Sequence, residues 1–473
     1  MKNKCLMREG CSNMKLKTMR FPHDMRAISL TVIALLGGWI VSVSSEGYML
    51  YGMAKRIHAN SRDLLTLSMI AQTIGFLLGG LLIRNMRASR ILLIISFSIC
   101  IFAGFILAFA PFWVCVISLM VSTALACGCF ASCGYFVKEL VPTQQRFGTA
   151  VNLIISISVI KTLTNLNTLY ISFYAGIALM LAIPLLGIIT ARNLPIKEKS
   201  ELVISRTEKR KLARAMLFLC LFILVVSLDF GIMMGFIGPK FYHIEWLKSW
   251  YCLVPYVCSA IIIKRLIRSE DRDNILYVAI SMIGFAFVGY LLFQKTEGGF
   301  LFIFTLLMGG WAIYDVFWWG MLGEMLDTPK NAALIVGLGF GASVAGNLAG
   351  KAIAYYGAFI TDMKVTIIIL ALISVTLVIL PLLHRSLSSL LKQGADAAPT
   401  AISEHSEDGI AAGMDGLTDR EKQIVSLMLK GKTCKLIADE LYLSENTVKT
   451  HIKNVYSKLG VRRKSELFEK MML

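Results

Sequence analysis

The amino-acid sequence predicts an all-α protein in which a bundle of twelve membrane helices precedes a small soluble helical domain. Hydrophobic residues make up 56% of the 473 residues and charged residues only 16%, whereas a soluble chain has about 25% charged residues. The shortage of charge is concentrated before residue 385. The end of the chain is polar and basic, with twelve Lys/Arg and eight Asp/Glu between Met414 and Leu473.

Twelve apolar runs predict the membrane bundle, because a helix of about 20 apolar residues crosses a bilayer. A basic loop with eight Lys/Arg, residues 192–214, separates the first six runs from the last six. This layout predicts a membrane domain, 27–384, with two related halves, 27–190 and 214–384, joined by a central loop, 191–213. The runs are 27–45, 64–84, 90–110, 112–136, 147–165, 168–190, 214–237, 248–267, 275–293, 299–321, 332–356 and 363–384.

The distribution of charge predicts that both ends of the chain lie in the cytoplasm. With this orientation the inner segments hold 25 Lys/Arg and the outer segments 7, and cytoplasmic loops carry the excess of Lys/Arg. Residues 1–26 have seven Lys/Arg and no apolar core, so we expect a cytoplasmic basic segment rather than a signal peptide. The expected location is the lipid bilayer of the bacterial inner membrane.

Four charged residues interrupt the apolar runs: Lys161, Asp229, Asp315 and Lys351. A charge at mid-membrane costs about 3 kcal/mol on insertion scales, so such residues usually line a cavity or pair with one another. Two acids and two bases fit ion pairs between helices and also fit a ligand cavity. Both interpretations remain open at this stage.

The tenth run adds a row of aromatic residues to one of these charges. Trp311, Tyr314, Asp315 and Trp318 fall on one helix face at 100° per residue. An aromatic face around an acid suits an unknown small-molecule ligand, aromatic or cationic, although Trp and Tyr also anchor helices at membrane interfaces. The candidate ligand cavity therefore comprises Lys161, Asp229, Trp311, Tyr314, Asp315, Trp318 and Lys351.

Catalysis has no support in the sequence. We find no nucleophile–base constellation, no phosphate-binding glycine loop and no metal-ligand spacing. Cys127, Cys129 and Cys133 form the one cluster among eleven cysteines, and in apolar runs such thiols pack as small hydrophobes; a metal or redox role is the alternative. We expect no catalytic residue, no metal and no cofactor.

After the membrane domain, residues 385–413 are expected to form a flexible linker. The segment 394–415 is rich in Ala, Ser, Gly and acidic residues, and about 25 such residues reach roughly 30 Å on average. The linker precedes a helical domain, 414–473, whose first helix starts at a capping box. There Thr418 precedes Glu421 by three residues, so that each side chain can bond to the other's backbone.

The third helix of this domain, Glu445–Leu459, has two separate faces. Val448, Ile452, Val455 and Leu459 repeat at core spacing. Ser444 caps the helix. The opposite face is polar and basic, as a helix that enters the major groove of DNA requires. Residues at the border between the two faces are suited to contact DNA phosphates. The candidate DNA-binding residues are Ser444, Asn446, Thr447, Lys449, Thr450, His451 and Lys453.

The six-plus-six layout resembles the major facilitator superfamily. Residues 79–90, GGLLIRNMRASR, lie where that family has a signature rich in glycine, aspartate and arginine, and residues 139–148, ELVPTQQRFG, resemble its loop after the fourth span. The resemblance covers residues 27–384 and implies a transporter fold. The usual acidic residue is absent from 79–90, where Asn85 is the nearest polar side chain, which argues against ordinary transport gating.

The C-terminal domain, Gly416–Leu473, resembles the LuxR-type helix-turn-helix. The match rests on Leu417-Thr418-Asp419-Arg420-Glu421, Ile437-Ala438, Leu441, Ser444, Thr447-Val448-Lys449-Thr450-His451 and Lys458-Leu459-Gly460-Val461. The resemblance implies a four-helix domain in which Lys449, Thr450 and Lys453 touch base edges. It also implies a homodimer on double-stranded DNA, formed by a fourth helix, Ser465–Met471, through Leu467, Phe468 and Met471.

Two hypotheses of function follow. In the first, the protein is a membrane-embedded one-component transcription regulator whose bundle senses a small molecule. In the second, it is an active secondary transporter that carries a regulatory DNA-binding domain. A helical bundle that binds only protein is a weaker alternative for the C-terminal domain, and an enzyme is a weaker alternative for the whole chain.

Overall fold

The computed structural model describes residues 22–44, 47–196, 206–241, 244, 246–266, 274–293, 296–327, 331–356, 362–396, 416–429, 437–438, 441, 443–461 and 467. The chain divides into two compact units between Leu391 and Lys392. All regular elements among the described residues are helices, which confirms the all-α prediction.

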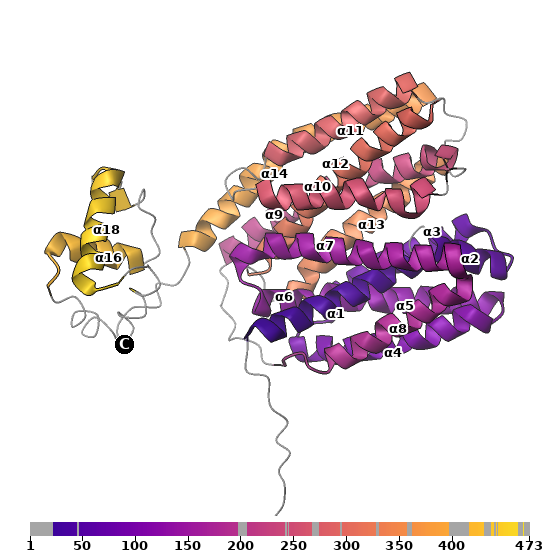
Figure 1. Ribbon diagram of the computed structural model, residues 1–473, viewed down its shortest axis with the longest axis horizontal. Helices are drawn as coiled ribbons and strands as arrows, with labels where there is room; N and C mark the ends of the chain where they lie inside the picture. Colours follow the sequence, from indigo (N-terminus) through magenta and orange to yellow (C-terminus); the bar gives the residue numbers. More distant parts are fainter. Residues whose placement is uncertain are drawn as a thin grey trace, which may run out of the picture. The chain divides into compact units, whose positions relative to one another are not determined.

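The first half of the membrane unit is a run of helices joined by short connections (Figure 1). Its elements are α1 (Pro22–Val43), α2 (Tyr48–Arg56), α3 (Ser61–Leu82), α4 (Met86–Phe109), α5 (Phe112–Ser132), α6 (Gly134–Leu140), α7 (Thr143–Leu166), the π-helical turn η1 (Asn167–Ile171) and α8 (Phe173–Ala191).

The second half repeats this plan and groups beside the first half in Figure 1, where it is drawn in pink to orange. Its elements are α9 (Arg206–Phe236), the 3-10 turn η2 (Gly238–Phe241), the π-helical turn η3 (Leu247–Tyr251), α10 (Leu253–Leu266), α11 (Asn274–Phe293), α12 (Glu297–Met325), α13 (Ala332–Tyr356) and α14 (Asp362–Asp396).

Eleven helices in the described part of the chain are long and apolar enough to cross a membrane. The eighth predicted run, 248–267, is instead split into η3 and the 14-residue helix α10. Pro255 is the third residue of α10, a first-turn position where the missing N–H has no intrahelical bond to lose. The proline therefore favours the start of an α-helix at this point.

The last membrane helix is longer than the sequence predicts. The twelfth run ends at residue 384, whereas α14 continues to Asp396. Residues 385–396, expected at the start of a flexible linker, are therefore helical. The rest of the expected linker, 397–415, lies outside the described residues.

The outer surface of the bundle suits lipid. Large apolar side chains are exposed along the helices, among them Leu82, Phe109, Trp113 and Leu292, with exposed fractions between 68% and 76%. In water such a surface would be unfavourable, but in a bilayer it meets hydrocarbon, and helices satisfy their backbone groups internally. The surface and the eleven helices together identify a multi-pass membrane protein.

Glycines allow α9 and α13 to approach backbone to backbone. A Cβ atom placed on Gly350 of α13 would lie 2.1 Å from the carbonyl oxygen of Leu228 and 2.9 Å from the Cα of Gly231, both on α9. No side chain fits in that space. The glycine-rich eleventh run thus serves close helix packing, as small residues do in membrane bundles.

The two halves meet through α3 with α13 and through α7 with α10 and α12. We call the end where α1 begins and α14 leaves the bundle the termini face, and the opposite end the far face. At the termini face the buried guanidinium of Arg146 donates to Asp327 Oδ1 at 2.7 Å and to the carbonyl of Gly323 at 3.0 Å. Nearby, the Tyr135 hydroxyl donates to Asn331 Oδ1 at 2.9 Å. These contacts join the halves on that side.

Replacing Gly350 with alanine should destabilise the membrane domain by about 1–3 kcal/mol, because the added methyl overpacks the α9–α13 contact. Gly284→Ala on α11 is the matched control, since its Cβ would meet no atom within 4 Å. Thermal unfolding of the detergent-purified chain measures both. Equal midpoints for the two variants would contradict the packing role of Gly350.

Candidate nucleic-acid interface and membrane cavity

The C-terminal unit has its own hydrophobic core, separate from that of the membrane unit. Helices α16 (Asp419–Leu429) and α18 (Glu445–Leu459) pack across it. The buried residues that form this core are Leu417, Ile424, Val425, Leu427, Met428, Ile437, Ala438, Val448, Val455, Leu459, Val461 and Leu467.

The predicted capping box at the start of α16 is present. The backbone N–H of Thr418 donates to Glu421 Oε2 at 2.8 Å, and the N–H of Glu421 donates to Thr418 Oγ1 at 3.3 Å. The same carboxylate accepts from the ammonium of Lys458, near the end of α18, at 2.7 Å. Glu421 thus connects the start of α16 to the end of α18, and it fixes the two helices relative to each other.

These bonds act on the charged form of Glu421. The hydrogen bond from Lys458, followed by that from the Thr418 N–H, lowers the pKa of Glu421 from 4.5 to about 2. The carboxylate is therefore ionised at neutral pH, and its negative charge also lies at the N-terminus of α16, where the helix dipole favours it.

Helix α18 is delimited at both ends by residues with the expected chemistry. The Ser444 hydroxyl accepts from the Thr447 N–H at 3.1 Å, and Gly460 ends the helix with a positive φ of 65°, a conformation that glycine adopts without strain. Between these caps Val448, Val455 and Leu459 are buried. The helix therefore has one fixed orientation in its domain.

The other face of α18 is open to solvent. Asn446, Lys449, Thr450 and Lys453 are all exposed, while Thr447 and His451 are half-buried at the border. Lys449 forms an ion pair with Glu445 at 2.8 Å, with both side chains about half exposed. Such a surface pair is weak, so it leaves Lys449 able to exchange Glu445 for another anion.

Of the residues expected to form the dimer, the structure describes only Leu467. Leu467 has no exposed surface and belongs to the core of its own domain, so its side chain does not lie at a surface where a second copy could contact it. A leucine in a short amphipathic helix fits a core and an interface equally well by sequence. Apart from Leu467, the residues of the expected fourth helix, Ser465–Met471, lie outside the described residues, Phe468 and Met471 among them.

A cavity of about 440 Å³ lies between the two halves of the membrane unit. It is lined by helices of both halves, including α1, α3, α5 and α7 from the first and α9, α10, α12 and α13 from the second. Its wall includes Tyr48 and Gly238 near the far face and reaches Phe76 and Trp319 toward the termini face. The cavity therefore extends through much of the bundle's depth.

Five of the seven residues predicted to line a cavity do so: Lys161, Trp311, Asp315, Trp318 and Lys351. Tyr314 does not, because its ring packs on Phe222 of α9, with centroids 5.9 Å apart. Asp229 is buried at 5% exposure and also lies off the cavity wall. The helical face that the sequence predicts is thus wider than the cavity that the structure forms.

Asp315 is held by two neutral donors. The Tyr256 hydroxyl donates to Asp315 Oδ2 at 2.5 Å, and the Trp318 indole N–H donates to Oδ1 at 2.9 Å. Tyr256 is on α10 and Trp318 is one turn along α12 from the acid. Sequence reasoning missed Tyr256, because nothing in an apolar run marks one tyrosine as the partner of an acid 59 positions away.

Aromatic rings form the cavity wall on the side of Asp315 that lies toward the termini face. Phe76, Phe130, Trp318, Trp319 and Phe340 form a connected group in which neighbouring centroids lie 4.7 to 6.2 Å apart. We call these five residues the aromatic floor. They come from α3, α5, α12 and α13 and thus from both halves, so a change in the distance between the halves must disturb the floor.

The wall also contains polar groups that were not predicted. Gln72, Asn165 and Asn347 line the cavity. Gln72 donates to the carbonyl of Ser44 at 2.7 Å, and Asn165 accepts from the N–H of Tyr48 at 3.1 Å. The Asn347 side-chain oxygen has no hydrogen-bond partner within the described structure. These amides add polar groups to the cavity wall, whereas the wall toward the termini face is aromatic.

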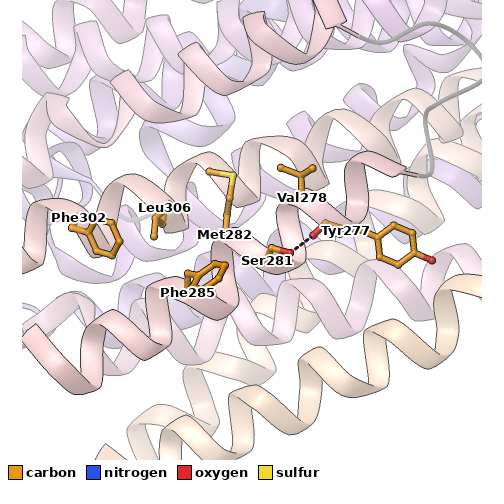
Figure 2. A pocket seen from close by; sticks show the side chains of 7 residues that line it. All are labelled: Tyr277, Val278, Ser281, Met282, Phe285, Phe302 and Leu306. Atoms are coloured by element: carbon orange, nitrogen blue, oxygen red, sulfur yellow. Dashed lines mark hydrogen bonds between the residues drawn. The ribbon is translucent and has the colours of Figure 1, made fainter.

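A second hollow lies between α11 and α12 (Figure 2). Its lining is Tyr277, Val278, Ser281, Met282, Phe285, Phe302 and Leu306, and the one hydroxyl of Ser281 already donates to the carbonyl of Tyr277 at 2.8 Å. Phe285 is 66% exposed on the surface that faces lipid. No charged side chain is among these lining residues, so this hollow offers mainly hydrocarbon contact.

Most of the described cysteines lie in the interior of the bundle. Cys127, Cys129 and Cys133 are buried and unpaired, and no group of metal-binding side chains occurs among the described residues. Asn85, which stands near the usual acidic position of the transporter signature, caps α4 by accepting from the Ala88 N–H at 2.7 Å. Its role in the structure is therefore local.

Comparison with known proteins identifies both units. Residues 415–471 match the family described as "Bacterial regulatory proteins, luxR family". The spore germination protein GerE of Bacillus subtilis is 48% identical over 50 residues, which are 11% of this chain and 68% of GerE. LiaR of the same organism is 46% identical over 52 residues, and DevR/DosR of Mycobacterium tuberculosis 40% over 53. The chain spans only about a quarter of these last two proteins.

The membrane unit has the major facilitator fold. The human organic anion transporter MFSD10 (TETRAN) superposes with a TM-score of 0.59 over 76% of this chain and 99% of its own, at 10% identity. The proton:xylose symporter XylE superposes with a TM-score of 0.57 over 75% of this chain and 94% of its own, at 13% identity. At these identities the likeness shows the fold alone.

Glu421→Gln should lower the thermal midpoint of the isolated domain 414–473 at pH 7, because the glutamine cannot replace the charged bonds to Lys458 and Thr418. The pKa of Glu421 is lowered on folding, so its contribution is complete above the unfolded value and is lost as pH falls toward 2. The wild-type and variant midpoints should therefore converge at acid pH. A gap that stays constant from pH 7 to pH 2.5 would contradict this.

Proposed function

The chain belongs, through its C-terminal domain, to the luxR family of bacterial regulatory proteins, and from this premise we propose that it is a membrane-embedded one-component transcription regulator. Its C-terminal domain binds operator DNA, and its major facilitator bundle senses a small organic molecule. The observation that carries this proposal is the presence, on one chain, of an exposed recognition face on α18 and of a cavity with a half-buried acid between the membrane halves.

The DNA-binding half of the proposal rests on the two faces of α18. The buried face fixes the helix in its domain, and the exposed face presents Asn446, Lys449, Thr450 and Lys453. In the major groove these side chains reach base edges. Ser444, Thr447 and His451, at the start and border of the helix, are assigned to phosphates. A homodimer on DNA would then contact two half-sites, with a contact surface other than Leu467.

The sensing half rests on the cavity. A ligand can shift a protein between two arrangements only if it binds one of them better. The cavity meets this requirement, because Lys161 lies on the first half and Asp315 and Lys351 lie on the second. A ligand that contacts both sides favours the spacing of the halves that it fits. The chain then connects the cavity to the DNA-binding domain through α14, which continues to Asp396.

Orientation follows from the same reasoning. An even number of spans places both termini on one side, and the excess of Lys/Arg assigns that side to the cytoplasm. The domain boundaries that we propose are 1–26, 27–384, 385–413 and 414–473, with the first twelve residues of the linker continuing α14 as a helix. The DNA-binding domain is thereby kept close to the bacterial inner membrane.

The second candidate function is active transport with an attached regulator. The intact major facilitator fold and the cavity favour it. Against it stands the signature segment 79–90, which has no acidic residue and in which Asn85 serves as a helix cap. Neither candidate requires an enzyme, because neither a luxR-type domain nor this fold depends on catalysis.

Replacing both Lys449 and Lys453 with alanine should weaken operator binding by the isolated domain about a hundredfold or more, since each lost base contact costs about 1–3 kcal/mol. Gel shifts at a fixed salt concentration measure the change. Lys422→Ala is the matched control, an exposed lysine on α16. Unchanged binding by the double variant would refute the assignment of the recognition face.

Salt offers a second measurement on the wild-type domain. Binding that depends on lysines against phosphates releases counterions, so the logarithm of the association constant should fall linearly as the logarithm of salt concentration rises. A wild-type affinity that is indifferent to salt would argue for a protein partner instead of DNA.

Uptake by membrane vesicles separates sensing from transport. A pure sensor should show no accumulation of solute above that of empty vesicles, whereas a transporter should accumulate its substrate and lose this activity in Asp315→Asn. Robust uptake that Asp315→Asn abolishes would overturn the sensor and establish the transporter. Asp63→Asn, an exposed acid at the start of α3, controls for the substitution itself.

A further inference from the structure

We propose that the cavity binds an organic cation, with its positive centre beside Asp315 and its apolar groups against the aromatic floor. This inference rests on the proposed sensing function and names the class of ligand. The expected ligand is a hydrophobic amine or another onium ion.

The first step is the charge of Asp315. Its two bonds come from the hydroxyl of Tyr256 and the indole of Trp318, which are both neutral, and within the described structure no cation is paired with it. An ionised carboxylate away from bulk water is costly unless a positive charge accompanies it. A carboxylate can accept about four hydrogen bonds, so two acceptor positions stay available to a ligand.

The second step is the ring faces around this carboxylate. Trp311 and Trp318 flank Asp315 by one helical turn on α12, and Trp319 and Phe340 continue the wall. The ring of Trp311 is fixed by Phe230, whose centroid is 4.2 Å away at an angle of 82°. The faces of aromatic rings attract cations, tryptophan most strongly, and the attraction grows when water is excluded. The carboxylate and the ring faces therefore both favour a positively charged ligand.

The third step is the position of the lysines. Lys161 is eighteen residues from the start of α7 and Lys351 nineteen residues from the start of α13, both counted from the termini face. Asp315 is only ten residues from the end of α12 at that face. At 1.5 Å per residue the lysines lie about 12 Å closer to the far face. They would repel a cation placed beside them, so they direct a cation to the aromatic end.

An anion fits this cavity less well. Beside the lysines an anion would lie nearer the far face than the aromatic floor and would not contact its rings. Near Asp315 an anion would be repelled by the carboxylate. The size of the cavity, about 440 Å³, is within the usual range of roughly 300–1,000 Å³ for sites of drug-sized ligands. A cation with a few rings or alkyl arms therefore fills it.

The test is equilibrium dialysis of the detergent-purified full chain with tetraphenylphosphonium and with tetraphenylborate, an anion of nearly the same shape. We expect the cation to bind at least about tenfold more tightly than the anion. Asp315→Asn should weaken binding of the cation by about tenfold or more, while Asp63→Asn, which changes an exposed acid that does not line the cavity, should leave it unchanged. Micelles without protein correct for partition into detergent.

A further variant separates the loss of charge from misfolding. Asp315→Glu keeps a carboxylate at this position, so it should retain most of the tetraphenylphosphonium binding that Asp315→Asn loses. If Asp315→Glu loses binding as completely as Asp315→Asn, the effect is one of structure and the proposal fails. Equal or tighter binding of tetraphenylborate, or no binding of either ion, also overturns it.

The same preparations distinguish this proposal from the proposed function. Binding of the chain to its operator fragment is measured with and without tetraphenylphosphonium. A cation that binds through Asp315 and leaves DNA binding unchanged supports the ligand class and overturns sensing. DNA binding that responds to an anionic or neutral compound but never to the cation supports sensing and overturns the ligand class.

Discussion

The interior of a bilayer provides no water, and this constraint governs the structure. Every polar group placed there must find its partner within the protein. The backbone meets the demand by forming helices, and the buried side chain of Gln72 meets it by donating to the carbonyl of Ser44. Asp315 meets it only in part, with two neutral donors. The incomplete pairing of one acid beside a cavity is the feature from which a binding site follows.

Much of this arrangement can be predicted from periodicity. Apolar runs locate the membrane helices, and the repeat of Val448, Val455 and Leu459 separates the buried face of α18 from its exposed face. Both signals are local and span a few helical turns. Lys161, Asp315 and Lys351 could be identified as cavity residues for a related reason, since a charge in an apolar run has few stable positions.

What could not be predicted depends on contacts between distant segments. Tyr256 bonds to Asp315 across helices, and no pattern within α10 marks it. Tyr314 lies on the predicted face but packs on Phe222, because α9 approaches that side of α12. Leu467 has the spacing of a contact residue and lies in the core. In each case the segment packed against the residue determines its partner or its burial. The periodicity of a single helix contains no information about that neighbouring segment.

The central claim is that the intact, membrane-embedded chain itself occupies DNA. The most direct measurement is crosslinking in living cells followed by recovery of DNA through a tag placed ahead of residue 1, so that only chains that retain the membrane domain are collected. We expect discrete genomic sites to be recovered with the full-length membrane protein. Recovery of those sites only with a shorter, soluble C-terminal fragment, or of no discrete sites at all, would contradict it.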